Sequence, residues 1–217
     1  MGKAFFVTGI DTSTGKSCAT GYLAREFSAK GYSVITQKFI QTGNSGISED
    51  IEVHRKIMGT ELLPEDLDGT TCPVTLSYPA SPHLASQIDG VRIDLGKIRN
   101  ATSVLQEKYD ITLIEGAGGI MTPITCDYTT LDYIRDQKFP VYIVTSPKLG
   151  SINHTLLTLE ACRHEKIEIL GVIYNKFNVE NNVICADTER YLKNYLNKHF
   201  DKSVWMKIDR IEIEKKF

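Results

Sequence analysis

Short apolar runs alternate along this chain with longer segments in which apolar residues recur at helical spacing. The runs that we predict as strands are 5–8, 32–38, 111–115, 141–144 and 169–174. The segments that we predict as helices are 18–30, 50–58, about 94–108, 151–164 and 184–198. Strands that are apolar throughout and are separated by helices are typical of a parallel sheet covered on both faces. The pattern therefore predicts an α/β fold with a doubly wound, mostly parallel sheet flanked by helices.

Turn and cap residues give the expected limits of these elements. Gly31 is suited to end the first helix, and Asp94 is a suitable N-cap for the helix that ends near residue 108. Residues 41–49 are polar and rich in glycine, which predicts a loop. Residues 60–81 contain several prolines. We expect an irregular surface segment there, which could form one wall of a substrate pocket.

Composition narrows the class of protein. With 217 residues and a formal net charge of −2, the chain fits a single α/β domain over residues 1–217. Charges of both signs are spread along it, without the basic stripe that nucleic-acid binding requires. Its five cysteines form no Cys-x-x-Cys pair, and no apolar run approaches the roughly 20 residues that span a bilayer. The first residues also lack the pattern of a secretion signal. We expect a cytoplasmic protein that binds neither nucleic acid nor membrane.

A phosphate-binding loop connects the first predicted strand to the first helix. Its sequence is Gly-Ile-Asp-Thr-Ser-Thr-Gly-Lys-Ser over residues 9–17. A glycine turn that leads into a helix N-terminus directs several backbone N–H groups at a phosphate, and the helix adds a partial positive charge. Lys16 would reach the outer phosphates of a nucleotide, and Ser17 would offer its hydroxyl to Mg²⁺. The five residues between the two glycines exceed the usual spacing by one, so the strand–loop–helix order is the stronger argument.

Further chemistry lies at the ends of strands, where ligands bind in an open α/β sheet. Lys38 ends the second predicted strand, Glu115 ends the third, and Asp50 follows the second after a loop. Mg²⁺ prefers oxygen ligands, so Ser17, Asp50 and Glu115 are candidate metal ligands. An alternative for Asp50 is that it caps the helix that begins there. Lys16 and Lys38 together indicate an anion between them, such as a phosphoryl group in transfer.

Five ordered motifs resemble those of the dethiobiotin synthetase family, a branch of the deviant P-loop NTPases. They are 6–12 with Gly-Lys-Ser at 15–17, 38–43, Ser-Pro-His at 81–83, Glu-Gly-Ala-Gly-Gly at 115–119, and Lys-Leu-Gly-Ser-Ile-Asn-His at 148–154. The resemblance covers roughly residues 4 to 175, and the long loop spacing is typical of that family. It implies a P-loop NTPase-like fold and an ATP-dependent ring closure in biotin synthesis. In that reaction 7,8-diaminononanoate takes up CO₂ as a carbamate, ATP phosphorylates the carbamate, and the second amine attacks the carbamic-phosphoric anhydride to give dethiobiotin, ADP and phosphate.

The same resemblance implies roles for individual residues. The residues that it places in catalysis are Lys38, Lys16 and Thr12. The residues that it places at the nucleotide are Asp11, Thr12, Ser13, Thr14, Gly15, Lys16, Ser17, Cys18, Glu115 and Asn175, with Asn175 at the base. The residues that it places at the substrate are Thr42, Gly118, Gly150, Ser151, Ile152 and Asn153. The last four would belong to a partner subunit, where a helix N-terminus suits the substrate's carboxylate. The implied cofactor is Mg²⁺, held by Ser17, Asp50 and Glu115, and the implied assembly is a homodimer.

The chain departs from the family pattern near its C-terminus. Ser-Val-Trp-Met-Lys-Ile at 203–208 replaces a Gly-x-Ile-Pro segment that packs near the base, so the selectivity for the base stays open. Trp205 could be a core residue of a late strand or a wall of the base pocket. Residues 207–217 could form an edge strand or an ordered tail. Phe39 stands where the family usually has proline, and we expect little effect of that change on the chemistry.

Several reactive side chains need no catalytic role. A lone histidine is more often a structural hydrogen-bonding residue than a base, so His83 and His154 stay outside the catalytic set. The histidines that we expect at the surface of polar helices are His54, His164 and His199. Cys18 is expected to be a small buried apolar residue on the first helix.

Two alternative functions stay open. A partitioning-type deviant P-loop ATPase binds partners and usually carries an additional lysine early in its phosphate loop, where this chain has Ile10 and Asp11. An amidating ligase of the same superfamily would act on a different small carboxylate and would normally need an ammonia source. No Cys-based glutaminase domain fits in the remaining length.

Overall fold

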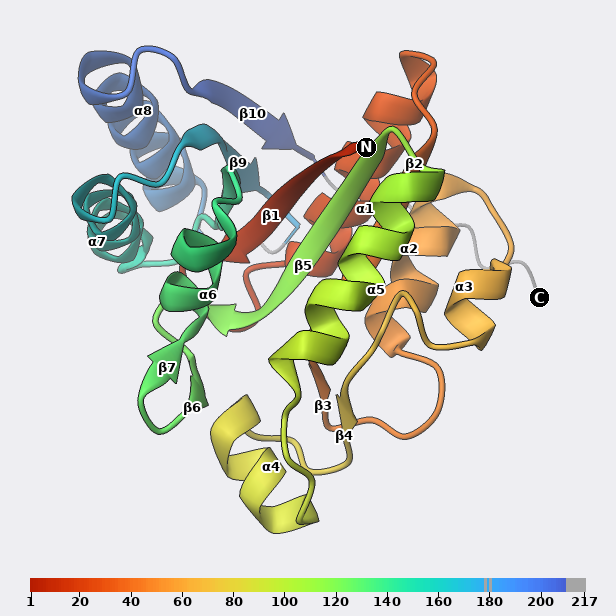
Figure 1. The fold of residues 1–217 in the computed structure, drawn as a ribbon. Coiled ribbons are helices and arrows are strands. Elements are labelled where there is room, and N and C mark those ends of the chain that lie inside the picture. Colours follow the sequence, from red (N-terminus) through yellow and green to blue (C-terminus); the bar gives the residue numbers. More distant parts are fainter. Residues whose placement is uncertain (178, 180, 210–217) are drawn as a thin grey trace.

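The centre of the molecule is a six-stranded parallel sheet with the strand order β10-β9-β8-β1-β5-β2 (Figure 1). The structure is a computed structural model that describes residues 1–177, 179 and 181–209. The strands of this sheet are β1 (Lys3–Gly9), β2 (Val34–Lys38), β5 (Ile111–Gly119), β8 (Val141–Thr145), β9 (Ile169–Asn175) and β10 (Val204–Ile208). The predicted doubly wound parallel sheet is confirmed.

Helices cover both faces of this sheet (Figure 1). The helices of the described residues are α1 (Lys16–Ala29), α2 (Glu49–Met58), α3 (Pro64–Leu67), α4 (Pro82–Asp89), α5 (Leu95–Lys108), α6 (Thr130–Gln137), α7 (Ser151–His164) and α8 (Asn182–His199). Along β1, Phe6 packs into a core with α5, α6 and α7, whereas Val7 packs into a second core with α1. Successive residues of a strand point to opposite faces, so a strand between two helical layers must be apolar on both.

Short elements that the sequence pattern did not predict lie beyond the carboxyl ends of the strands. They are β3 (Gln41–Thr42) paired with β4 (Thr75–Leu76), β6 (Pro123–Thr125) paired with β7 (Tyr128–Thr129), and the helices α4 and α6. Two-residue strands carry no readable periodicity. The start of α6 did carry a signal, because Thr129 and Asp132 form a reciprocal capping box. The Asp94 cap of α5 is confirmed, since its carboxylate accepts hydrogen bonds from the N–H groups of Gly96 and Lys97.

The C-terminal strand β10 forms one edge of the sheet. Trp205 lies in this strand, packs against the larger core and stacks on Tyr174 with ring centroids 5.6 Å apart. The interpretation of Trp205 as a core residue of a late strand is therefore supported. Lys207 and Ile208 belong to the same edge strand, and the rest of the predicted strand or tail, residues 210–217, lies outside the described residues.

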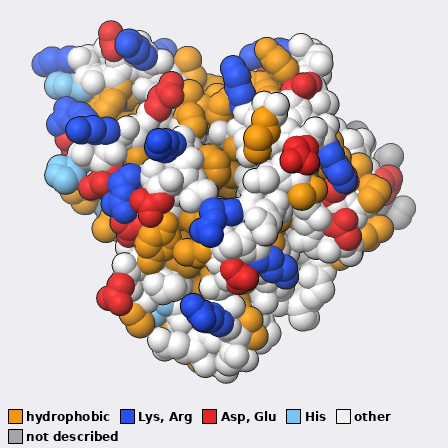
Figure 2. All heavy atoms as spheres, in the orientation of Figure 1, with side chains coloured by type: hydrophobic (Ala, Val, Ile, Leu, Met, Phe, Trp, Pro, Cys, Tyr) orange, Lys and Arg blue, Asp and Glu red, His pale blue; other side chains and the backbone are white. Residues whose placement is uncertain are grey.

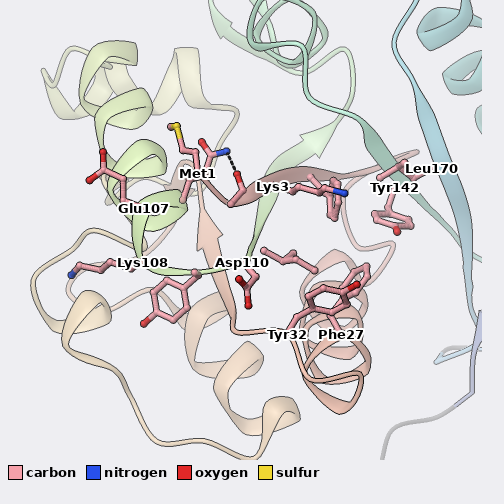
Figure 3. Close-up of a pocket in the computed structure, with 14 residues that line it drawn as sticks. Met1, Lys3, Phe27, Tyr32, Glu107, Lys108, Asp110, Tyr142 and Leu170 are labelled. Carbon is pink, nitrogen blue, oxygen red and sulfur yellow. Dashed lines mark hydrogen bonds between the residues drawn. The ribbon is translucent and has the colours of Figure 1, made fainter.

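A hollow of approximately 570 Å³ lies at the amino ends of β1, β2 and β5 (Figure 3). Its apolar walls include Phe5, Phe27 and Tyr142, and the side-chain amide of Gln106 donates to the Gly2 carbonyl beside it. The phosphate loop and the strand-end acids lie at the opposite edge of the sheet. This hollow is therefore separate from the predicted chemistry.

The surface carries charges of both signs. Figure 2 shows Lys and Arg side chains interspersed with Asp and Glu side chains over the visible face. Within the described part of the chain, no helix combines the length and the apolar character that crossing a membrane requires.

Candidate active site

The phosphate loop is held in place by a residue from the far end of the chain. β1 ends at Gly9 and α1 begins at Lys16, with Gly15 in the left-handed region at φ 80°. A Cβ atom on Gly15 would lie 1.9 Å from the side-chain nitrogen of Asn175, which donates a 3.0 Å hydrogen bond to the Thr14 carbonyl. Glycine is thus required at this position both for its backbone conformation and for the close approach of Asn175.

Lys16 points back across the loop. Its buried ammonium donates to the Asp11 carbonyl oxygen at 3.0 Å. Burial, together with the nearby positive charge of Lys38, lowers the pKa of Lys16 to about 8, although Glu115, Asp50 and Asp11 oppose the change. A phosphate placed in the loop would add negative charge beside Lys16 and favour its charged form.

Ser17, Lys38, Asp50 and Glu115 meet beside the loop. Strands β2 and β5 pair so that Lys38 lies opposite Glu115, and α2 brings Asp50 to the same point. The Ser17 hydroxyl oxygen lies 2.6 Å from Asp50 Oδ1 and 3.0 Å from Glu115 Oε1. Lys38 Nζ lies 2.6 Å from Asp50 Oδ2 and 2.9 Å from Glu115 Oε1, and it also donates to the Gly116 carbonyl. The residues predicted from separate motifs therefore form one cluster.

The charges in this cluster stabilise one another. Burial by itself opposes the charge on Lys38, but the Glu115 and Asp50 carboxylates outweigh it and raise the pKa of the lysine. Burial likewise opposes ionisation of Glu115, yet the Lys38 charge and a hydrogen bond from His54 hold the pKa of this carboxyl well below its usual range. Both groups are consequently charged at neutral pH.

Asp50 does not cap α2. The N-cap is Ser48, whose hydroxyl accepts a hydrogen bond from the Ile51 N–H group, and Asp50 lies one residue inside the helix. Its carboxylate is therefore free to turn toward Ser17 and Lys38. The alternative interpretation of Asp50 as a helix cap is wrong.

A cavity of approximately 300 Å³ opens in front of this cluster. The predicted site residues that line it are Thr12, Ser13, Gly15, Lys16, Ser17, Lys38, Thr42, Asp50, Glu115 and Gly118. Sequence reasoning missed Ile40, Gln41 and Ala117, which also line it. The predicted residues that lie outside its lining are Asp11, Thr14, Cys18, Asn175, Gly150, Ser151, Ile152 and Asn153. The core of the predicted site is thus assembled within one chain.

The α7 segment forms a second, separate hollow. Gly150, Ile152 and Asn153 line it together with Val183 and Asp187 of α8, and its volume is approximately 650 Å³. Leu149 beside it is 86% exposed. Within a single chain, the start of α7 therefore does not share the cavity of the phosphate loop.

The prediction that Cys18 is a buried apolar residue is partly corrected. Cys18 is half-buried, and burial together with the Glu115 and Asp50 charges raises the pKa of its thiol, which disfavours the reactive thiolate. His83 pairs with the Ser81 hydroxyl, and His154 is exposed on α7.

The prediction that His54 lies at the surface is wrong. Its ring is completely buried under the cluster and lies 2.7 Å from Glu115 Oε2. A signal was present in the sequence, because His54 and Arg55 stand at helical spacing between Ile51 and Met58 on the inner face of α2. The prediction placed His54 at the surface because the residue is polar.

The cluster fits a magnesium ion in its donor chemistry. The Ser17 hydroxyl lies within hydrogen-bond distance of the Asp50 and Glu115 carboxylates, so three side chains with oxygen ligands meet there. No group of three or more His, Cys, Asp and Glu side chains suited to a metal occurs among the described residues. A site with few protein ligands is typical of Mg²⁺, which keeps several waters and binds phosphate oxygens of the substrate.

Comparisons of the whole chain add independent evidence. Residues 3–204 match the family model described as an AAA domain. The chain is 50% identical to ATP-dependent dethiobiotin synthetase BioD 2 of Haemophilus ducreyi, over 97% of this chain and 100% of that protein. It is 47% identical to the protein of the same name from Pasteurella multocida, over 98% and 100%. It is 45% identical to dethiobiotin synthetase BioD of Chlorobaculum tepidum, over 91% and 83%.

Solved structures show the same fold at much lower identity. A plasmid partition protein of Borrelia burgdorferi bound to AMPPNP superposes with a TM-score of 0.56 at 16% identity, over 100% of this chain and 90% of that one. The pNOB8 ParA protein bound to nonspecific DNA gives 0.57 at 13% identity, over 100% and 88%. At this identity the likeness concerns the fold alone.

Proposed function

This chain belongs to the family of ATP-dependent dethiobiotin synthetases, and we propose that it converts 7,8-diaminononanoate, CO₂ and ATP into dethiobiotin, ADP and phosphate in biotin synthesis. The observation that carries the proposal is the assembly of Lys16, Lys38, Ser17, Asp50 and Glu115 around one cavity in a chain so similar to these synthetases over its whole length.

The proposed reaction needs positioning and charge stabilisation more than a nucleophile on the protein. CO₂ bonds to one amine of the substrate with loss of a proton, which gives a carbamate. A carbamate oxygen attacks the γ-phosphorus of ATP and ADP leaves. The second amine then attacks the carbonyl carbon, loses a proton and expels phosphate. Lys16 and Lys38 would stabilise the negative charge that develops on the transferred phosphoryl oxygens. Thr12, Thr42 and Gly118 line the same cavity and would hold the carbamate end of the substrate.

The nucleotide would lie on the phosphate loop. The backbone N–H groups of residues 11–18 at the start of α1 suit its phosphates, and Asn175, which holds the loop at Thr14, would lie toward the base. Ser17, Asp50 and Glu115 would hold Mg²⁺, which supplies charge neutralisation between the phosphates when it is bound.

A homodimer would complete the substrate site. The start of α7 at residues 150–153 lies outside the cavity of its own chain, so we infer that it binds the substrate's distant carboxylate in the partner subunit. The apolar hollow and the exposed Leu149 beside it support an interface there.

We also infer a cytoplasmic enzyme that binds neither nucleic acid nor membrane, because its visible charges are mixed and its five cysteines are free thiols. The two alternative functions receive less support. The two partition proteins named above share the fold at 16% and 13% identity, and the phosphate loop lacks the additional lysine that is usual in partitioning-type ATPases. The relatives named above are dethiobiotin synthetases, which favours that reaction over the one of an amidating ligase.

The test is a product assay with purified protein, diaminononanoate, labelled bicarbonate and Mg-ATP. We expect label in a cyclic urea together with release of phosphate. Phosphate release without label in the product would contradict the proposal. A competition between ATP and other nucleoside triphosphates in the same assay would show whether the altered segment 203–208 has loosened selectivity for the base.

A further inference from the structure

A buried chain of polar side chains lies directly behind Glu115. His54 Nε2 lies 2.7 Å from Glu115 Oε2, and His54 Nδ1 lies 3.0 Å from the Thr36 hydroxyl. Arg55 Nη1 donates to the same hydroxyl at 2.9 Å, and its other nitrogens form a two-pronged ion pair with Asp66. All five side chains are buried, and at most 6% of each residue is exposed.

The directions of these hydrogen bonds follow from the donors. Arginine can only donate, so Thr36 accepts from Arg55. Among the described residues, His54 Nδ1 is the acceptor within reach of the Thr36 hydroxyl proton. A carboxylate oxygen can only accept, so His54 Nε2 carries the proton that lies between it and Glu115 Oε2, and Nδ1 can then accept from the Thr36 hydroxyl.

The two oxygens of Glu115 therefore have different partners. Oε2 is held from behind by His54, whereas Oε1 faces Ser17 and Lys38 in the cavity. A carboxylate held at one oxygen cannot rotate freely, so its other oxygen stays aimed at the cluster. Partners of this kind orient metal ligands in many proteins.

We propose that His54 is a positioning residue, which through the Asp66–Arg55–Thr36 chain presents one fixed oxygen of Glu115 to the magnesium ion of the bound nucleotide. This inference rests on the metal site of the proposed function. It adds that the site depends on a residue that touches neither nucleotide nor substrate, and that the dependence runs through a donated Nε2–H.

The energetics of Asp66 support a stable anchor for this chain. Burial by itself would raise the pKa of the Asp66 carboxyl, but hydrogen bonds from Arg55, the Leu63 N–H group and Thr71 bring it below its usual value. Asp66 is therefore ionised and holds the Arg55 guanidinium in a fixed plane. The fixed guanidinium in turn fixes the direction of the Thr36 hydroxyl.

The test compares binding of the nonhydrolysable ATP analogue AMPPNP with Mg²⁺ and with EDTA, by calorimetry on the full chain. For His54→Leu, which fills similar space with an apolar side chain that cannot donate, we expect the affinity gained from Mg²⁺ to fall about 10- to 100-fold. Binding in EDTA should stay at the wild-type level, because Glu115 contributes through the metal. His54→Gln, whose amide can donate from a similar place, should restore most of the loss. The matched control is His164→Leu at an exposed position of α7, which should change neither affinity.

Several outcomes would overturn the proposal. Equal losses with Mg²⁺ and with EDTA would mean that His54 only supports the fold. No gain from Mg²⁺ in the wild type would remove the metal site and this inference with it. A protein that forms no dethiobiotin but shows the selective His54→Leu loss would refute the assigned substrate and leave this inference standing.

A second measurement uses the wild-type protein, so it does not depend on whether a variant folds. Long-range ¹⁵N–¹H correlation spectra of the wild-type imidazoles report which ring nitrogen carries the proton. We expect a proton on His54 Nε2. A ring that carries its proton on Nδ1 alone would overturn the proposed hydrogen bond to Glu115.

Discussion

Replacement of Lys38 by methionine tests the proposed site most directly, because this lysine joins both acids of the cluster. Its ammonium lies 2.6 Å from Asp50 and 2.9 Å from Glu115, and its side chain is 6% exposed. Methionine keeps the length of the side chain and removes the charge. The substitution leaves Glu115, 1% exposed, without its nearest cation.

The structure gives an expected size for the effect on stability. Breaking a buried ion pair by removing one partner costs about 3–5 kcal/mol. The lower end applies here, because a quarter of the Asp50 side chain is exposed and His54 still donates to Glu115. For a chain of this length, about 3 kcal/mol corresponds to a Tm lower by about 6–12 °C. Mg²⁺ should recover part of that loss, since it would supply a cation to the same two carboxylates.

Turnover should fall by more than the decrease in folded protein explains. If Lys38 stabilises charge on the transferred phosphoryl group, turnover falls about 10²–10³-fold, or about 2.7–4 kcal/mol. The assay measures labelled cyclic urea at a temperature well below the Tm of the variant. Lys108→Met is the matched control, because Lys108 pairs with Glu65 at a half-exposed surface site and should affect neither readout strongly.

Two results would refute this reasoning. Near-normal turnover in folded Lys38→Met protein would show that Lys38 is a structural cation only. An unchanged Tm would show that the two acids do not depend on Lys38 for their charge balance.

Three further predictions follow from other parts of the site and its support. The pKa of Lys16 is about 8, and phosphate binding needs the charged form of this lysine. Above pH 8 the Kd for ATP should therefore rise by up to about tenfold per pH unit. Calorimetry across pH measures this, and a Kd that does not change with pH would contradict it. Gly15→Ala should lower the free energy of unfolding by about 1–3 kcal/mol and weaken ATP binding, because Gly15 has a φ of 80° and a Cβ there would clash with Asn175. In the double variant with Asn175→Ala, which removes this clash, part of the loss should be recovered. Asp66→Asn should cost about 3–5 kcal/mol of unfolding free energy by leaving Arg55 buried without its partner. Since the pKa of Asp66 is lowered in the folded protein, its stabilisation is present at neutral pH and is lost as the pH falls through the carboxyl range, so denaturant titrations should show a weaker acid dependence in the variant than in the wild type.

The order of the main elements and the nature of the site were readable from the sequence. Strands buried on both faces must be apolar along their whole length, and a phosphate loop must carry its glycines and its lysine in one continuous segment. The cores around Phe6 and Val7, and the loop from Gly9 to Ser17, therefore followed from local patterns. The positions of Lys38 and Glu115 also followed, because parallel strands end at the same edge of a sheet.

Only the tertiary structure decided what lies behind and beside these residues. Whether Asp50 caps its helix or turns to Ser17 depends on how α2 packs on α1, and that packing is not written in the local pattern. The helical spacing places His54 on the inner face of α2, but only the fold shows that a buried carboxylate lies against it. His54 became part of the site because folding removed it from water and left Glu115 and Thr36 as its hydrogen-bonding partners. Contacts between residues far apart in the chain depend on three-dimensional packing, and local periodicity does not record them.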